Sequence, residues 1–370
     1  MAGLYIHIPF CLSKCGYCDF YSYRPDDVQA ASYVCALLDE ITTLRRVSQL
    51  CESVPAQFST VYIGGGTPSV LGGEPLAKIL DCISERFSLT DGCEITVECN
   101  PSSCSGELFS ALKNAGANRI SLGLQSSDDA ERKALGRRSG ARELRQAVDN
   151  ARAAGFQNIS VDVMLGIPHQ TMQSLKNTLD FCLSLDITHI SSYILKIEDN
   201  TYFKKIESRL SLPDDDEVCD MYLFTTDYLA ENGFHQYEIS NYSREGFESR
   251  HNLNYWDCGE YLGIGPAAHS FLNGSRFFFP RDTQKFIEGN APVFDCRGGD
   301  FTEYAMLRLR LTQGLTERET LERFNRPIGG GLRKNLQKYV SDGFAIADED
   351  HIALTPKGFL ISNTILSNIL

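Results

Sequence analysis

The chain has 370 residues, of which 42% are apolar and 22% charged, an ordinary composition for a folded soluble protein. This length allows one large α/β domain and a smaller unit. The formal net charge of −13 argues against a general nucleic-acid binder, because phosphate contacts require a basic face. We find no apolar run of about 18 residues and no signal peptide, so we expect a cytoplasmic protein without a transmembrane segment.

The first predicted element is a strand over Leu4–Ile8, where apolar and β-prone residues alternate until Pro9. Cys11, Cys15 and Cys18 follow at the spacing Cys-x3-Cys-x2-Cys. A [4Fe–4S] cluster normally takes four thiolates, so three would leave one iron open to a ligand with paired amine and carboxylate groups. The alternative is a zinc site, with His7 or a distant cysteine as fourth ligand.

The other cysteines indicate no disulfide framework. The total of 13 is odd, and most lie singly in apolar runs, as Cys35, Cys82, Cys182 and Cys219 do. We therefore expect these to be buried free thiols in a reducing compartment.

Strands and helices then alternate along the chain. The predicted strands after the first are 59–63, 94–98, 119–124, 158–165 and 189–195. The predicted helices are 27–50, 75–87, 107–115, two beginning at Asp129 and Ala141, 171–185 and 216–232. This alternation is typical of parallel βαβ units, but it does not distinguish a part-barrel from a doubly wound sheet.

Polar residues and one glycine recur in or just after these strands. They are Tyr5, Gly65, Glu98, Gln125, Asp162 and Tyr193. Any one has an ordinary explanation, such as capping the next helix. In a β/α barrel, however, the carboxyl ends of the strands meet on one face, so six such residues predict a shared site. The run Gly64–Thr67 suits a backbone that approaches a ligand closely, although a flexible turn has the same composition.

The later part of the chain divides into three stretches. Residues 198–217 are polar and contain Asp214, Asp215 and Asp216, which predicts a surface loop or lid. From 301, three helices (301–313, 316–325, 331–341), a hairpin (343–355) and a terminal helix from Pro356 predict a winged-helix-like α+β domain packed on the barrel. We expect the domains to be 1–235, a connecting region 236–300, and 301–370.

The cysteine spacing resembles the signature of the radical S-adenosylmethionine superfamily. Tyr5-Ile-His-Ile-Pro-Phe-Cys11 and Gly64-Gly-Gly-Thr-Pro68 are similar to words of the oxygen-independent coproporphyrinogen oxidases. Those oxidases carry a further cysteine where this chain has Phe20, and a long N-terminal arm where this chain begins its strand at residue 4. Both departures resemble the sister branch, the HemW haem chaperones. The resemblance covers nearly the whole chain.

This resemblance implies an incomplete (β/α)6 barrel that holds a [4Fe–4S] cluster on Cys11, Cys15 and Cys18. It further implies S-adenosylmethionine contacts from strand ends and loops, namely Gly65, Gly66, Thr67, Glu98, Gln125, Arg137 and Asp162, with Tyr5 and Tyr17 on the adenosyl side. Arg137 suits a cofactor carboxylate as a bidentate donor, although a solvated helix end explains it equally.

The word His251-Asn-Leu-Asn-Tyr-Trp256 resembles the hallmark of the chaperone branch. It implies haem as a further cofactor, with His251 as its axial ligand, because imidazole commonly ligates haem iron and aromatic rings stack on a macrocycle. An ordinary hydrogen-bonded histidine stays open. The expected function is delivery of haem to respiratory acceptor proteins, with a reductant for the cluster. The alternatives are coproporphyrinogen III oxidase, which converts two propionates to vinyls, and another radical enzyme.

Overall fold

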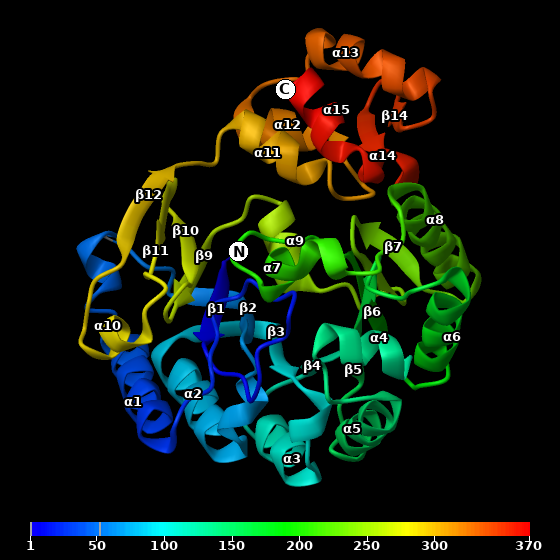
Figure 1. Ribbon diagram of the computed structural model, residues 1–370. Coiled ribbons are helices and arrows are strands. Elements are labelled where there is room, and N and C mark those ends of the chain that lie inside the picture. Colours follow the sequence, from blue (N-terminus) through cyan, green and yellow to red (C-terminus); the bar gives the residue numbers. More distant parts are fainter. Residues whose placement is uncertain (1, 52) are drawn as a thin grey trace.

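The computed structural model describes residues 2–51 and 53–370 (Figure 1). Six parallel strands form its centre, in the order in which they occur along the chain. They are β1 Gly3–Ile8, β2 Gln57–Gly65, β3 Ser88–Cys99, β4 Arg119–Gln125, β5 Asn158–Leu165 and β6 His189–Ile194. All six strands predicted from the sequence are therefore present, with ends that differ by a few residues at most, except for a longer start of β3.

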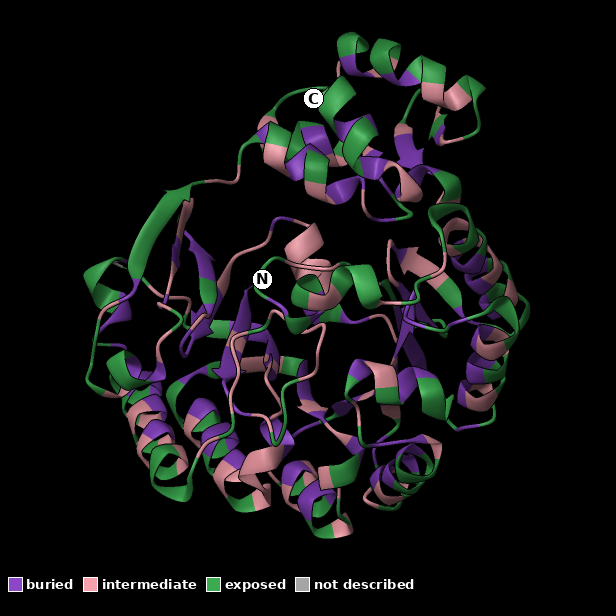
Figure 2. Ribbon diagram, viewed as in Figure 1, coloured by how far each residue is buried: buried purple, intermediate pink, exposed green. Residues whose placement is uncertain are grey.

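Helices cover the outer face of this sheet, with buried sides turned toward the strands and exposed sides toward solvent (Figure 2). They are α1 Asp27–Thr43, α2 Gly73–Arg86, α3 Gly106–Asn114, α4 Asp129–Leu135, α5 Ala141–Ala153, α6 Met172–Leu183 and α8 Asp215–Glu231. The short helix α7 Tyr202–Ile206 lies against the loop that follows β1 instead. Leu4, Ile6 and Ile8 of β1 are fully buried against this layer. Because strand side chains alternate, the residues between them, Tyr5 and His7, face the interior of the curved sheet.

The sheet continues beyond the six parallel strands on both sides. The added strands are β7 His235–Glu238, β8 Asn241–Ser243, β9 Tyr261–Ile264, β10 His269–Leu272, β11 Ser275–Phe278 and β12 Val293–Arg297. β9 pairs in parallel with β1, and β8 pairs antiparallel with β6. The resulting order runs from β12 to β7 without closing on itself. The expected incomplete barrel is confirmed, and residues 236–300 contribute strands to its sheet.

Residues 301–370 form a small unit of helices and a three-stranded sheet, drawn in orange and red in Figure 1. Its elements, together with two short helices before it, are α9 Arg250–Trp256, α10 Thr283–Ile287, α11 Phe301–Arg308, β13 Leu315–Thr316, α12 Glu317–Phe324, α13 Gly330–Ser341, β14 Ala345–Ala347, β15 His351–Leu354, α14 Pro356–Leu360 and α15 Ser362–Ile369. The predicted hairpin is present, and β13 adds a third strand to it. Throughout the described ranges, no helix combines the length and apolarity needed to cross a bilayer.

The structure corrects the expectation of a loop over 198–217. α7 lies within this stretch, and Asp214 caps α8, where its side chain accepts from the backbone N–H of Glu217 at 2.8 Å. Asp215 and Asp216 occupy the first turn of α8, where the helix dipole stabilises negative charge. Adjacent acids therefore mark the beginning of a helix.

The predicted burial of single cysteines is also only partly right. Cys182 is buried, whereas Cys82 and Cys219 are half-buried and Cys35 is exposed. Cys35 lies on α1 between Tyr33 and Leu37, which both face the core, so the 3.6-residue period places it on the solvent side.

Candidate functional site

The three clustered cysteines lie on a loop that leaves the carboxyl end of β1. The backbone N–H of Cys11 donates to the carbonyl of Tyr23 at 2.9 Å, and that of Tyr23 donates to Pro9 at 3.0 Å, so the loop is pinned at its base. Cys15 and Cys18 are joined by a turn, with the N–H of Cys18 3.3 Å from the carbonyl of Cys15. All three thiols are half-buried, which leaves them accessible to a ligand.

The glycine run after β2 is fixed against this loop. The N–H of Gly66 donates to the Ile8 carbonyl at 2.8 Å, and that of Thr67 donates to the Phe10 carbonyl at 2.7 Å. The Thr67 hydroxyl lies 3.3 Å from Cys11 Sγ. A Cβ at Gly66 would stand 2.6 Å from the Phe10 carbonyl oxygen, so only glycine fits this close approach. The run is therefore a rigid shelf beside the thiols.

Glu98, near the end of β3, connects the shelf to the barrel interior. Its carboxylate accepts from the N–H of Gly65 at 3.1 Å and from the Tyr62 hydroxyl at 2.6 Å. Its pKa is raised to about 7, mainly by burial and also by the neighbouring carboxylate of Asp162, against the opposing effect of the Tyr62 donor. Such a carboxyl favours a cationic partner, for example an ammonium group placed beside the shelf.

Gln125, Arg137 and Asp162 lie on the other side of the interior. Gln125 ends β4 with a φ of 75°, an uncommon conformation for a residue with a side chain, and its Oε1 has no hydrogen-bond partner in residues 2–51 and 53–370. Arg137 donates to the Gly123 carbonyl and places Nη1 3.9 Å from Cys15 Sγ. Asp162 accepts from the Tyr193 hydroxyl at 3.3 Å, and burial raises its pKa.

The expected residues therefore face one interior, on the side that carries the cysteine loop, although Tyr5 and Asp162 lie within β1 and β5 and not at their ends. An orphaned amide oxygen, an arginine beside a thiol and a glycine shelf fit a ligand with both polar and charged groups. A single metal ion needs donors that converge on one point, and within the described ranges no three His, Cys, Asp or Glu side chains do so. Thiolates bound to separate irons of a cube have no such requirement, so this donor set fits a cluster.

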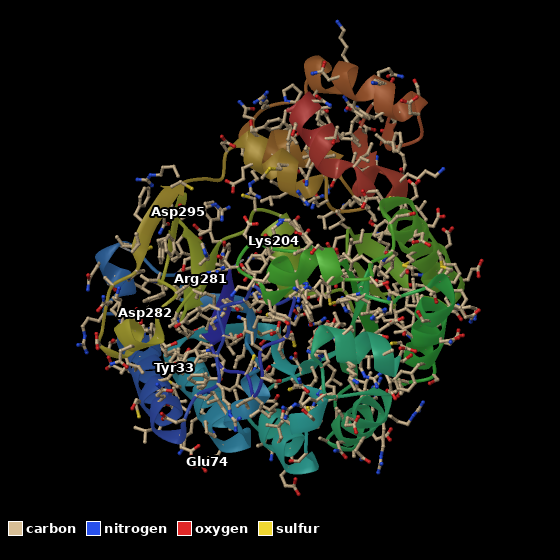
Figure 3. All side chains as sticks on the ribbon, viewed as in Figure 1. Tyr33, Glu74, Lys204, Arg281, Asp282 and Asp295 are labelled. Carbon is tan, nitrogen blue, oxygen red and sulfur yellow. The ribbon has the colours of Figure 1, made fainter. Side chains whose placement is uncertain are left out.

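The short helix α7 covers one side of the loop, a contact that the sequence analysis missed. The N–H of Phe203 donates to the Gly16 carbonyl at 2.9 Å, and its ring packs on Tyr17, with centroids 6.3 Å apart. A Cβ at Gly16 would stand 2.6 Å from the Phe203 ring. Lys204, labelled in Figure 3, marks this helix in front of the strands.

His251 is 1% exposed and both its ring nitrogens have partners. Nδ1 lies 2.8 Å from the Thr60 hydroxyl, and Nε2 lies 2.8 Å from the Tyr255 hydroxyl. Its ring stacks on Tyr62 with centroids 5.1 Å apart. Burial lowers its pKa to about 3, so the imidazole is neutral. This geometry favours the alternative that the sequence left open, a hydrogen-bonded histidine inside the barrel.

Arg119 is a second interior residue that the sequence analysis did not single out. It begins β4 and is only 2% exposed, yet its Nε has no partner in the described part of the chain. No ion pair within residues 2–51 and 53–370 involves it. The alternation of Arg119 with Ile120 and Leu122, which face the helices, was a usable signal, because it predicts an inward charge.

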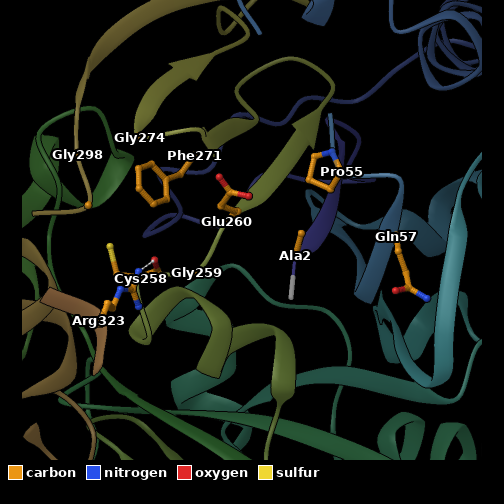
Figure 4. A pocket seen from close by; sticks show the side chains of 11 residues that line it. Ala2, Pro55, Gln57, Cys258, Gly259, Glu260, Phe271, Gly274, Gly298 and Arg323 are labelled. Carbon is orange, nitrogen blue, oxygen red and sulfur yellow. Dashed lines mark hydrogen bonds between the residues drawn. The ribbon is translucent and has the colours of Figure 1, made fainter. Parts of the chain in front are cut away.

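Two cavities flank this region. The larger, of about 620 Å³, lies at the amino ends of β1 and β2 near Ala2 and Gln57, opposite the cysteine loop (Figure 4). Arg323 closes part of it by donating to the Cys258 carbonyl at 2.6 Å. The smaller, of about 380 Å³, includes Tyr5 and His7 and reaches Phe20 and Tyr21 of the loop. Despite its size the larger cavity is remote from the thiols, so the smaller one belongs to the candidate site.

Comparisons with known proteins agree with this arrangement. The model of the radical SAM superfamily matches residues 5–182, and that of the HemN C-terminal domain matches residues 301–361. Heme chaperone HemW of Bacillus subtilis is 34% identical, over 100% of this chain and 99% of its own. The HemW of Escherichia coli is 32% identical over 98% and 97%.

One solved structure supports the fold. Coproporphyrinogen III oxidase (HemN) of Escherichia coli, described as a radical SAM enzyme, superposes with a TM-score of 0.83. The match covers 100% of this chain and 89% of the other at 21% identity. At that identity the likeness concerns the fold alone. The full-length relatives above 30% identity carry the assignment, and the chain belongs to the HemW family of the radical SAM superfamily.

Proposed function

We propose that this protein is a haem chaperone, which binds haem and delivers it to haem-requiring respiratory proteins in the cytoplasm. The observation that carries the proposal is the match over essentially the full length to proteins named heme chaperone HemW. The arrangement of the site supports it, because the thiol loop lies at the mouth of a part-barrel with polar groups and an adjoining aromatic cavity.

In this proposal Cys11, Cys15 and Cys18 hold a [4Fe–4S] cluster whose fourth iron stays open. When bound, the cluster and S-adenosylmethionine supply one-electron chemistry that side chains alone do not perform. The chain's own residues orient and bind. Their proposed contacts are the shelf Gly65, Gly66 and Thr67, the carboxylates Glu98 and Asp162, the amide of Gln125, the guanidinium of Arg137, and the rings of Tyr5 and Tyr17.

The charges support these roles. Glu98 beside the N–H of Gly65 offers a carboxylate to an amino group, and Arg137 offers a guanidinium to a carboxylate. Arg137 lies next to Cys15, so both ends of an amino acid can be bound close to the thiols. A reductant for the cluster and the haem acceptor are the further partners that the proposal requires.

The cluster is tested by anaerobic reconstitution of the full chain. We expect about four irons per chain, and none in a Cys11→Ala, Cys15→Ala, Cys18→Ala variant, because each thiolate binds one iron. Cys35→Ala is the control, since Cys35 is exposed on α1. Four irons retained in the triple variant, or zinc alone in the native protein, would refute the cluster.

The function is tested by setting a haem titration beside a coproporphyrinogen decarboxylation assay. We expect haem binding and no conversion of propionates to vinyls, because Phe20 occupies the position where the oxidases carry a further cysteine. The second candidate function is that of a coproporphyrinogen III oxidase, which the similarity in fold favours. Robust decarboxylation by the native chain would establish it and exclude the chaperone.

A further inference from the structure

The cavity of about 380 Å³ beside the cysteine loop is formed in part by the strands that extend the sheet beyond β1. The inner face of β9–β11 supplies one wall, the loop at Phe20 and Tyr21 supplies another, and Tyr255 of α9 lies on a third side. Its volume is within the range of small-molecule sites, roughly 300–1,000 Å³. Phe20 at its edge is 66% exposed, so a ligand bound here would be partly accessible to solvent.

The histidines around the cavity differ in what their ring nitrogens contact. His7 bonds to the Tyr5 hydroxyl at 3.0 Å and the Tyr21 carbonyl at 2.9 Å, and His251 is likewise bonded on both nitrogens. His269, at the beginning of β10, is exposed in the cavity, and its ring makes no hydrogen bond to residues 2–51 or 53–370. Its ring stacks on Phe278 with centroids 5.1 Å apart, which fixes the imidazole without occupying its nitrogens.

Two arginines give the same cavity a positive side. Arg276 of β11 pairs with Glu303 and lies 3.2 Å from the Tyr261 hydroxyl. Arg281 lies after β11, where Figure 3 labels it, and its contact with Asp19 is a loose one of 3.4 Å. The Arg281 side chain is 57% exposed, so solvent screens this pair and another carboxylate can share the guanidinium.

Aromatic rings complete the lining. Tyr255 and Tyr261 meet edge to face with centroids 4.6 Å apart, and Tyr21 and Phe20 face them from the loop. Aromatic surfaces favour a flat conjugated ligand. The exposed side chain of Phe20 also favours binding, because covering a large apolar side chain with a ligand removes it from water and lowers the free energy of the complex.

We propose that this cavity is the haem pocket of the protein, with the His269 imidazole as an axial ligand of the iron and Arg276 and Arg281 facing the propionates. The proposal rests on the proposed haem-binding function and replaces His251 as the ligand. Each part of haem has a partner of suitable chemistry: imidazole for iron, guanidinium for carboxylate and aromatic rings for the macrocycle. The carboxylates nearby, Asp19, Asp295 and Glu303, are already held beside arginines or lie outside the lining.

The same contacts connect the pocket to the cysteine loop. Asp19, which pairs with Arg281, follows Cys18 directly, and the Tyr21 hydroxyl accepts from the backbone N–H of Thr283 at 3.0 Å. A propionate that draws Arg281 away from Asp19 therefore changes the charge beside Cys18. Haem occupancy would be transmitted to the cluster loop through this pair.

The ligand is tested by titrating hemin into the full chain and recording the Soret band. We expect His269→Ala to shift the band and to weaken binding at least about tenfold, or ~1.4 kcal/mol. His251→Ala should leave the band in place, and His235→Ala is the matched control, because His235 is exposed on β7 at the other end of the sheet. Added imidazole should restore the native band to His269→Gly. This rescue distinguishes the loss of an iron ligand from the loss of the fold.

The propionate contacts are tested by comparing hemin with its dimethyl ester. The native chain should prefer hemin, and Arg281→Gln should lose part of this preference, because Arg276 still lines the cavity. No haem binding by the native chain would refute the proposed function itself. Native binding with an unchanged band and affinity in His269→Ala, or a shifted band in His251→Ala alone, would refute this pocket and leave haem binding intact.

Discussion

Individual side chains in the part-barrel owe their properties to the polarity of its interior. Tyr5, Tyr62, Glu98, Arg119 and Asp162 all lie where the common β/α barrel packs branched aliphatic residues. A buried charge is costly unless it is paired, and Arg119 keeps an unpartnered Nε within the described residues. This interior is therefore organised to contact a ligand at a cost in stability.

In the proposed site, contact of Glu98 with S-adenosylmethionine would make binding of that cofactor depend on pH. Its pKa of about 7 means that the carboxylate needed by an ammonium group is lost below neutrality. We expect affinity to rise with pH through about 7, by up to tenfold per pH unit below it. Glu98→Gln should bind weakly with a flat profile between pH 6 and 8, measured by anaerobic calorimetry. Glu74→Gln, an exposed carboxylate on α2, is the control, and a flat native profile would contradict the assignment.

The same raised pKa acts on the stability of the ligand-free protein with the opposite sign. The unfolded chain releases the Glu98 proton near its ordinary value of 4.5, whereas the native state keeps it to about 7. Between these values the native state binds more protons, so the free energy of unfolding falls as pH rises. This contribution is fully present below pH 4.5 and is lost above 7.

The sequence predicted which polar residues lie in or after the strands and face the interior, because polar side chains there interrupt apolar alternation. It did not identify Tyr62 or the contacts of His251. Tyr62 is one tyrosine within a β-rich run, and its meeting with Glu98 depends on the register between β2 and β3. His251 lies far along the chain from Thr60, so no local pattern predicts their contact.

Single helices and strands depend on local signals, of which the beginning of α8 is an example. Asp214 and Glu217 form a reciprocal capping box, with Asp214 N–H 3.0 Å from Glu217 Oε2. Asp214→Ala should lower the free energy of unfolding by about 1 kcal/mol, because a backbone donor loses its acceptor. Chemical denaturation measures this. Asp227→Ala on the exposed face of α8 should change it by less than about 0.5 kcal/mol, and equal losses would contradict the capping role.

Helix boundaries were predicted well where such caps or glycines stand, and poorly elsewhere. α1 was expected to run to Leu50, but it ends at Thr43, where Leu44 adopts a φ of 49° and a 3₁₀ turn follows. α7 was missed because its five residues are too few for a helical period to be recognised.

The packing of residues 301–370 on the barrel depends on Arg308 of α11. This buried guanidinium donates to the Gly314 carbonyl at 3.0 Å, to Glu319 at 2.9 Å and to Asp257 at the end of α9. Arg308→Met should lower the free energy of unfolding by about 3 kcal/mol, because breaking a buried ion pair leaves its partners buried without a counter-charge. Calorimetry should show an earlier transition. Arg318→Met, an exposed arginine on α12, is the control, and coincident transitions in both variants would refute the role.

The arrangement of the sheet as a whole was predictable only in part. Alternating strands and helices predicted the six parallel strands in order, since right-handed crossovers place successive strands side by side. The pairing of β9 with β1 was not predictable, because it joins Tyr261 to Gly3 and no motif marks so distant a partner. Yet this pairing creates the cavity beside the cysteine loop.

The position of β1 between β2 and β9 has a consequence for how the protein is made. Gly3–Ile6 pair with Thr60–Ile63 on one side and with Tyr261–Ile264 on the other. During translation at roughly 5–20 residues per second, β9 leaves the ribosome on the order of ten to fifty seconds after β1. Until then one edge of β1 has no strand beside it, and the cysteine loop follows a sheet that still lacks β9. The wall that carries the cysteine loop is therefore complete only after some of the last residues of the sheet have reached the first ones.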